Sequence, residues 1–417
     1  MLSITMKSKH NLNSAFKAMP SLKFVFALIF SLNALVINAN NNVWTGTWAT
    51  ATQPVEPNNM PPAPGLTNNT FRQIIRVSIG GETLRLRFSN LFSKSPLTIK
   101  SVGIADAGMG SEIAMKSSKN LKFKGKKGVI IDANGEITCD PIKFKLKPGS
   151  NLSITICYGE TPKDLTGHPA SRTTSYLITG NTSTKGDFSN AIKTDHYYTI
   201  NRVEVLASKS AGAIAILGNS IADGRGSGIG KQNRWPDVLS NRLQNNSSTK
   251  QRGILNVSIG GSGLLYGGLN LKAIDRLERD VFTQNNVKWL IITMGVNDIG
   301  SQRNAEAANR TANSIIETYK KFIELAHARG IKVYGCPILP FAKSMYDADY
   351  RQTAKETVNN WIRTSNTFDG VIDFDPSMRN PEDPSSLLPN VHDKDWLHPN
   401  ELGYKLMGEA IDLKLFE

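Results

Sequence analysis

Cysteine and long hydrophobic runs are scarce in this sequence, and their scarcity narrows the classes of protein to consider. The 417 residues include three cysteines, Cys139, Cys157 and Cys336, with none of the short spacings typical of a zinc site. The chain also lacks a series of apolar runs long enough to span a membrane repeatedly. Because 40% of the residues are hydrophobic, a chain of this length has a sizeable core without disulfide bonds. We expect a globular protein with no metal site.

The cysteines themselves allow two interpretations. If the protein is exported, Cys139 and Cys157 are free to pair, since both lie in the N-terminal half. Cys336 lies in the apolar segment 333–339, which predicts a buried free thiol.

Acidic residues are absent from the first 39 residues, which contain four lysines and then the apolar run 24–37. This pattern predicts a signal peptide, residues 1–39, cleaved near Ala39, and hence a secreted or periplasmic protein without stable membrane insertion. A retained anchor is the alternative, but the run is short and Asn33 interrupts it. The long basic segment leaves open whether Met19 is the true start.

The formal charge of +14 does not by itself indicate a partner. Much of it lies in the lysine-rich stretch 116–127, which is not interleaved with aromatic residues as in many nucleic-acid-binding segments. A solvated basic face is the commoner explanation. We therefore predict no nucleic-acid partner, and the oligomeric state stays open.

Short alternating runs dominate residues 43–205, as in Thr83–Phe88 and Leu152–Ile156. Such runs, separated by Gly, Asn, Asp and Pro, predict an all-β domain with a sandwich or jelly-roll-like architecture. The segment from Pro54 to Pro64 contains five prolines and is predicted to be a loop.

Residues 211–417 have a different pattern, in which apolar runs alternate with longer segments of helical period. The predicted strands are 213–217, 254–259, 288–293, 332–339 and 371–374. The predicted helices are 235–243, 269–281, 305–329, 350–364 and 400–413. This alternation predicts a parallel sheet flanked by helices, with reactive groups at the carboxyl ends of its strands.

Polar and glycine residues follow the first three predicted strands. Ser220 stands in Gly-Asn-Ser after the first, Gly261 in a glycine-rich segment after the second, and Asn297 in Gly-Val-Asn-Asp after the third. Each has an ordinary explanation, as a turn residue, a tight turn or a helix cap. Each also suits a nucleophile or a donor of hydrogen bonds to an oxyanion.

Asp395 and His398 form the most specific pattern, directly before the last predicted helix. A carboxylate three residues before a histidine reaches its Nδ1–H within one turn and leaves Nε2 free to act as a base. His392 and Asp393 flank this pair, but the different offset of Asp393 favours Asp395 as the partner.

The order of these four segments resembles the SGNH hydrolase superfamily, also called GDSL esterases and lipases. The resemblance covers roughly residues 213–411 and implies a flavodoxin-like sheet. It further implies that Ser220 is the nucleophile, that Asp395 and His398 activate it, and that Ser220, Gly261 and Asn297 form the oxyanion hole. Neither a metal nor an organic cofactor is implied.

The first block of this family usually reads Gly-Asp-Ser, whereas this chain has Asn219 in place of the aspartate. The replacement removes a negative charge, so it affects the tuning of the site more than its chemistry. With the preceding β domain, the chain resembles the branch of xylan-associated arylesterases and acylhydrolases.

These features predict a carboxylic ester hydrolase that removes acetyl or other short acyl groups from small esters or from acylated polysaccharides. A lipase or lysophospholipase acting on longer chains is the alternative within the same class. A glycan-binding protein with a decayed site and a metal-dependent phosphatase are alternatives from other classes. Ser220 and His398 argue against decay, and the lack of an Asp pair near the first strand argues against the phosphatase.

Several further residues have no assigned role from the sequence. Asp298 is expected to support the turn of the third block, and His168 to be a surface or core histidine. Asp223, Arg225 and Arg234 either line the pocket or lie in a solvated loop. The β domain is expected to bind glycan, to shape one wall of the active site, or only to stabilise the enzyme.

Overall fold

The computed structural model describes residues 42–417 apart from 183, 185 and 268–270. The predicted signal peptide, residues 1–39, lies outside these described residues. Among them, no helix is both long enough and apolar enough to cross a membrane.

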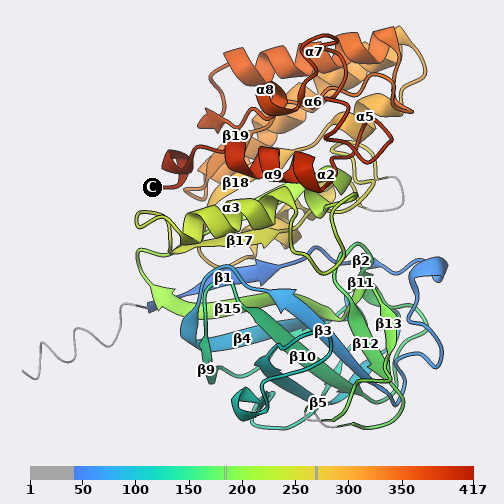
Figure 1. Ribbon diagram of the computed structural model, residues 1–417, viewed down its shortest axis with the longest axis vertical. Helices are drawn as coiled ribbons and strands as arrows, with labels where there is room; N and C mark the ends of the chain where they lie inside the picture. The colour runs from blue at the N-terminus through green and yellow to red at the C-terminus, as the bar shows by residue number, and fades with distance from the viewer. Residues whose placement is uncertain (1–41, 183, 185, 268–270) are drawn as a thin grey trace, which may run out of the picture. The chain divides into compact units, whose positions relative to one another are not determined.

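The N-terminal part of the described chain is mostly β-structure, in three sheets (Figure 1). The first sheet contains β1 (Asn42–Ala49), β15 (Ile200–Ser208), β4 (Gly81–Ser89), β8 (Glu136–Thr138) and β9 (Ile142–Leu146). The second contains β13 (Ile192–Thr194), β12 (Ser175–Ile178), β3 (Thr70–Arg76), β10 (Asn151–Tyr158), β5 (Leu97–Asp106), β6 (Lys119–Asn120) and β7 (Val129–Ile131). The third contains β14 (Tyr197–Tyr198), β11 (Thr166–His168) and β2 (Gln53–Pro54).

A large hydrophobic core fills most of this β region, and a smaller cluster contains Ile74, Tyr176 and Phe188. The large core takes side chains from both larger sheets, among them Phe71 and Ile154 of the second sheet and Leu86 and Val205 of the first. The pairings of β10 with β3 and β5, and of β15 with β4, are antiparallel. A mostly-β N-terminal region is thus confirmed, whereas the jelly-roll arrangement stays a prediction.

The C-terminal part contains a five-stranded parallel sheet in the order β17-β16-β18-β19-β20. Its strands are β16 (Gly212–Gly218), β17 (Arg252–Asn256), β18 (Val287–Thr293), β19 (Lys332–Gly335) and β20 (Gly370–Val371). Numbered along the chain this order is 2-1-3-4-5, which is the flavodoxin-like order. The strand β16, which lies between β17 and β18, is fully buried, which explains its continuous apolar run.

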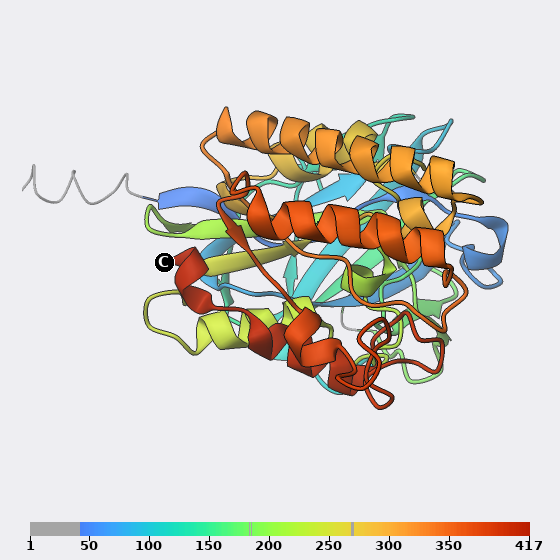
Figure 2. The ribbon, with the colours of Figure 1, turned by 90° about the horizontal axis from the view of Figure 1, so that it is seen from above.

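Helices cover both faces of the sheet. They are α2 (Ser220–Asp223), α3 (Trp235–Gln244), α4 (Ala273–Leu277), α5 (Val296–Gly300), α6 (Ala305–His327), α7 (Asp349–Thr364), α8 (Asp375–Met378) and α9 (Glu401–Ala410). Figure 2 shows α3 and α9 on one side and α6 and α7 on the other. In α6 the buried residues Ala308, Ala312, Ile315, Tyr319 and Phe322 recur at helical spacing, and this apolar stripe holds the helix on the sheet.

Several predicted elements have different ends in the structure. β17, β19 and β20 stop earlier than predicted, at Asn256, Gly335 and Val371. The next residues still bond to the neighbouring strand, as in the Cys336 N–H, which donates to the Ile292 carbonyl at 3.0 Å. The predicted helix 269–281 begins outside the described residues, at 269 and 270; its described part contains the short α4 followed by a π-helical turn, η4 (Glu278–Phe282). The last helix ends at Ala410, and a 3₁₀ turn, η5 (Leu413–Phe416), follows.

Two further expectations were wrong in detail. The proline-rich segment is not entirely a loop, since its first residue belongs to β2 and it contains the 3₁₀ turn η2 (Pro57–Asn59). Elsewhere in the β region, a second 3₁₀ turn is η3 (Met115–Ser117). Cys139 and Cys157 do not pair. Cys139 directly follows β8, and its Sγ accepts from the Leu86 N–H, whereas Cys157 lies in β10 and contacts Thr70 Oγ1. Cys336 is a buried free thiol, as predicted.

The two parts of the described chain pack against each other. Ala49 and Ala51, at the end of β1 and beyond it, belong to the hydrophobic core of the parallel sheet. The Ile254 N–H of β17 donates to Ser78 Oγ at 2.9 Å, and Arg202 of β15 donates to the Thr283 carbonyl at 2.7 Å. The β region therefore lies along the β17 edge of the sheet (Figure 1).

Candidate active site

Ser220 lies just beyond the carboxyl end of β16, as the first residue of α2. Gly218 ends the strand where the chain passes between its neighbours, and a Cβ there would come within 2.9 Å of Ser258 Oγ and Thr293 Cγ2. Asn219 caps the helix, because its Oδ1 accepts from the Ile221 N–H at 2.9 Å. The Ser220 N–H belongs to the first turn of α2, where N–H groups have no partner within the helix.

The Ser220 hydroxyl faces the histidine of the C-terminal segment. Ser220 Oγ lies 2.8 Å from His398 Nε2, and His398 Nδ1 lies 2.6 Å from Asp395 Oδ2. The three side chains thus form one continuous chain of hydrogen bonds, although Ser220 and His398 are 178 positions apart in the sequence. This arrangement is able to move a proton from the hydroxyl to the imidazole.

A tight turn holds the Asp395 carboxylate against His398. Its Oδ1 accepts from the backbone N–H groups of Leu397 and His398, at 3.0 and 2.9 Å. Trp396, between them, has a positive φ of 56°, which L-residues seldom adopt. The helix α9 then starts after Asn400, whose side chain caps it.

Burial and hydrogen bonding shift both ionisable groups of this pair. Desolvation lowers the pKa of His398, and the neighbouring Asp395 carboxylate offsets part of that decrease. Desolvation acts to raise the pKa of Asp395, but the N–H and side-chain hydrogen bonds from His398 and Leu397 outweigh it, so this pKa is lowered. An ionised Asp395 next to a neutral His398 suits a general base near neutral pH.

The flanking residues do not take part in this hydrogen-bond chain. His392 Nδ1 accepts from the Trp396 N–H at 3.2 Å, and its ring stacks on the Trp396 ring at 4.1 Å between centroids. Asp393 donates through its backbone N–H to the His398 carbonyl at 2.7 Å. Arg225 is 57% exposed at the edge of the site, with Nη2 3.9 Å from Asp395 Oδ2.

The second block forms a loop after β17. Gly261 has a φ of +74°, a conformation that glycine adopts without strain. Gly260 donates its N–H to Asp223 Oδ2 at 2.8 Å, which connects the loop to α2. Gly261 thus follows directly on a point of contact with the nucleophile's helix.

Asp298 holds the rest of this loop rather than its own turn. The carboxylate is completely buried and accepts from the N–H groups of Leu264, Leu265 and Tyr266, at 2.8, 2.8 and 3.3 Å. Burial raises the pKa of Asp298, and these N–H groups act against that rise. The third block therefore fixes the loop of the second.

Asn297 is the second residue of α5, and its side chain turns toward the same loop. Its Nδ2 donates to the Ser262 carbonyl at 2.9 Å, and its Oδ1 accepts from the Tyr346 hydroxyl at 3.1 Å. The helix-capping alternative is not realised, because Gly295, with a φ of +103°, occupies the cap position. One N–H of the amide is bonded to Ser262, and the amide has a second N–H to offer.

A completely buried arginine, Arg276, supports the loop from beneath. It donates to the carbonyls of Val257 and Gly218 at 2.7 and 3.3 Å and to Ser262 Oγ at 3.4 Å, and it pairs with Asp280 at 3.1 Å. Our sequence analysis missed this residue and Tyr346. For Arg276 a signal existed, since it lies on the apolar face of its helical segment with Asp280 four residues later.

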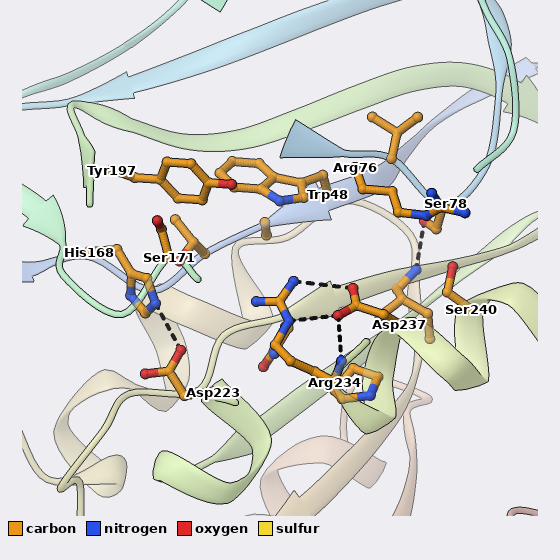
Figure 3. A pocket seen from close by; sticks show the side chains of 16 residues that line it. Trp48, Arg76, Ser78, His168, Ser171, Tyr197, Asp223, Arg234, Asp237 and Ser240 are labelled. Carbon is orange, nitrogen blue, oxygen red and sulfur yellow. Dashed lines mark hydrogen bonds and ion pairs between the residues drawn. The ribbon is translucent and has the colours of Figure 1, made fainter. Parts of the chain in front are cut away.

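Arg234 and Asp223 are not in a solvated loop. Arg234 forms two hydrogen bonds to Asp237, at 2.7 and 3.1 Å, and Asp223 is 2% exposed. Both line a cavity of about 30 Å³ between the β region and α3 (Figure 3). In the described part of the chain, no three His, Cys, Asp or Glu side chains are grouped so as to hold a metal ion.

Comparison with known proteins gives one family and a set of solved structures. Residues 216–406 match the model of the GDSL-like Lipase/Acylhydrolase family. No curated protein matches the chain.

Three of the similar structures each align with about half of the chain. A putative lipolytic protein of the G-D-S-L family from Desulfitobacterium hafniense is 21% identical, over 48% of this chain and 96% of that one, with a TM-score of 0.36. A putative acylhydrolase from Bacteroides fragilis is 22% identical, over 48% and 83%, with a TM-score of 0.35. An acetyl xylan esterase from Geobacillus stearothermophilus is 18% identical, over 50% and 98%, with a TM-score of 0.38.

Proposed function

We propose that this carboxylic ester hydrolase, whose residues 216–406 match the GDSL-like Lipase/Acylhydrolase family, removes acetyl or other short acyl groups from polysaccharides by serine catalysis. The observation that carries this proposal is the hydrogen-bond chain from Ser220 through His398 to Asp395, at 2.8 and 2.6 Å.

In the proposed reaction His398 Nε2 takes the Ser220 proton as Oγ attacks the ester carbonyl. Asp395 stabilises the resulting imidazolium and holds the ring in place. His398 then returns the proton to the leaving alkoxide, and an acyl group stays on Ser220. Water, activated by the same histidine, releases the acid and restores the serine.

The negative oxygen of the intermediate would lie among three donors: the N–H groups of Ser220 and Gly261 and the Asn297 side-chain amide. All three lie in segments that follow β16, β17 and β18 at the carboxyl edge of the sheet. Asp223, Asp298 and Arg276 bond to the loop that carries Gly261. Such preorganised donors are the largest contribution to many acyl-transfer reactions.

The core next to the nucleophile turn is tightly packed. A cavity there is lined by Asn219, Ile221 and Val296 among others and has a volume of about 10 Å³, which is at most enough for one water molecule. The polysaccharide part of the proposal rests on the resemblance of the sequence to the xylan-associated branch.

One observation favours the alternative of longer acyl chains. Tyr266 and Met345 are 51% and 81% exposed, and they lie on the loops that follow β17 and β19 at the edge that carries Ser220. Exposed apolar side chains of this kind are able to contact an acyl chain on the surface of the protein.

The test is hydrolysis of p-nitrophenyl esters from acetate to decanoate, followed by release of acetate from acetylated xylan. We expect the highest kcat/KM for acetate or propionate and loss of activity in Ser220→Ala. Ser227→Ala is the matched control, because the Ser227 hydroxyl donates to the Gly224 carbonyl and has no part in the proposed reaction.

Three other results would each redirect the assignment. Activity that rises toward decanoate would favour a lipase. Binding of xylan without cleavage of any ester by folded wild-type protein would favour a glycan-binding protein. A metal-dependent hydrolase would be favoured if a chelator abolished the activity and Ser220→Ala were as active as the wild type.

We also propose that the protein acts outside the cytoplasm, since the first 39 residues have the composition of a signal peptide. N-terminal sequencing of the protein secreted by its host tests this proposal. A mature N-terminus close to residue 40 is expected, and an N-terminus at Met1 or Met19 would contradict it.

A further inference from the structure

A buried histidine of the β region contacts the helix that begins with Ser220. His168 is the last residue of β11, and its Nε2 lies 2.9 Å from Asp223 Oδ1, at the end of α2 (Figure 3). The two residues are 3% and 2% exposed. A residue outside the family-matched segment 216–406 is therefore bonded to the helix that carries the nucleophile.

Asp223 has a second contact, directed at the proposed oxyanion loop. Its Oδ2 accepts from the Gly260 N–H at 2.8 Å, and Gly260 directly precedes Gly261. One carboxylate thus connects the nucleophile's helix, the oxyanion loop and the β region. A shift of this carboxylate would move the Gly261 donor relative to Ser220.

The hydrogen bonds of His168 determine the net charge of the pair. Its Nδ1 lies 2.9 Å from the Ala51 carbonyl oxygen, which only accepts, so Nδ1 carries a hydrogen. Nε2 faces a carboxylate oxygen, which also accepts unless it is protonated. The contact therefore contains one more proton, on Nε2 or on Asp223. In either form the His168–Asp223 pair has no net charge.

Other cations close to Asp223 are bonded elsewhere. Arg234 lines the same cavity of about 30 Å³, but its guanidinium is held by Asp237 (Figure 3). Arg276 is bonded to Asp280 and to backbone carbonyls. A cavity of this size has room for about two water molecules, which are too few to solvate a carboxylate as bulk water does. Arg234 and Arg276 interact with Asp223 only through space, whereas His168 is bonded to it directly.

We propose that His168 is a positioning residue for the esterase reaction. By neutralising Asp223, it lets this carboxylate hold the Gly260 amide without leaving an uncompensated negative charge behind the oxyanion loop. A net charge there would oppose the negative charge that develops on the substrate oxygen. The inference rests on the proposed function, and it assigns to the β region a direct part in building the site.

Three variants separate this role from simple stabilisation of the fold. His168→Ala leaves the Asp223 charge buried and unpaired, and we expect kcat for p-nitrophenyl acetate to fall about 10- to 100-fold, with KM within about threefold. Asp223→Asn keeps every hydrogen bond, because its NH₂ donates to a neutral His168 Nε2 while its oxygen accepts from Gly260. This variant should retain kcat within about threefold of wild type. Adding Asp223→Asn to His168→Ala should recover most of the lost kcat.

The recovery is decisive, since a merely structural role of His168 would not be restored by changing Asp223. Arg202→Gln is the matched control: it removes another buried contact between the two parts of the chain, to Thr283, and should lower Tm without lowering kcat. If His168→Ala does not fold, the same measurements are made with His168→Gln, which fills the volume and still donates to Asp223.

An unchanged kcat in His168→Ala, or a double variant no better than the single one, would overturn the inference while the proposed function stands. Absence of ester cleavage by wild type, measured in the same assay with Ser220→Ala as the baseline, would overturn the proposed function and this inference with it.

Discussion

The Tyr346 hydroxyl donates to Asn297 Oδ1 at 3.1 Å, and this bond fixes the orientation of the Asn297 amide. With Oδ1 taken by Tyr346, Nδ2 points to the Ser262 carbonyl and offers its second N–H to the site. Burial raises the pKa of Tyr346, so the hydroxyl keeps its proton and acts as the donor. A residue of the loop after β19 therefore orients a donor carried by α5, the helix after β18.

Tyr346→Phe tests this relationship, because it removes the hydroxyl and little else. We expect kcat to fall about 3- to 10-fold with KM nearly unchanged, which is a fraction of the effect of losing an oxyanion donor itself. Tyr350→Phe is the control, since its hydroxyl bonds to the Gln302 carbonyl at 3.3 Å. Equal kcat values for the two variants would contradict a role of Tyr346 in orienting Asn297.

Asn297→Ala should reduce kcat for acetate esters by about 10²- to 10³-fold, the usual effect of removing one oxyanion donor. Ser220 and His398 remain, so residual turnover should exceed that of Ser220→Ala. Steady-state kinetics measures the difference in kcat. Asn309→Ala is the control, because Asn309 is an exposed asparagine on α6. A wild-type rate in Asn297→Ala would remove this residue from the proposed oxyanion hole.

The pH dependence of kcat/KM should have an acidic limb controlled by His398. Its neutral form is the base, so activity should rise as pH increases through the His398 pKa. Because burial lowers that pKa, the midpoint should lie below the ordinary histidine value of about 6.5. The limb should persist in His392→Asn, whose oxygen replaces Nδ1 as acceptor for the Trp396 N–H. Disappearance of the limb in that variant would assign it to His392.

Arg276→Met should destabilise the protein by about 3 kcal/mol, the lower part of the range for removing one partner of a buried ion pair. The lower value is expected because Asp280 retains Arg279 as a partner. Urea unfolding measures the change in the free energy of unfolding. The control is Arg310→Ala, which removes the exposed Arg310–Glu306 pair and should cost less than about 1 kcal/mol. A similar small loss in both variants would mean that Arg276 does not brace the loop.

The three thiols should react with a disulfide reagent only after unfolding. All three cysteines are free and buried, and burial raises the pKa of Cys139 to about 11, so the reactive thiolate is scarce at neutral pH. Thiol titration should find three groups per chain in denaturant and very slow reaction in the native protein. A single reactive group in denaturant would indicate the disulfide between Cys139 and Cys157 that the structure lacks.

The parallel sheet was predictable, because a strand that is buried on both faces must be apolar throughout, as in β16, and an amphipathic helix must show its stripe, as in α6. The proximity of Asp395 to His398 was also accessible, since three residues of chain limit their separation. These are local constraints, which a sequence expresses directly. The family resemblance then joined blocks that local patterns left separate.

The sequence alone determined which residue types follow each strand, because turn geometry and burial act within a few residues along the chain. Only the tertiary structure decided their partners: that Asp298 holds the loop of the second block, that Arg276 bonds to two strand ends, and that His168 of the β region faces Asp223. Such contacts join segments 14 to 58 positions apart, and each depends on how whole elements pack. Hydrogen bonding between distant buried groups leaves no periodic signal in the chain, so these roles became visible only in the folded protein.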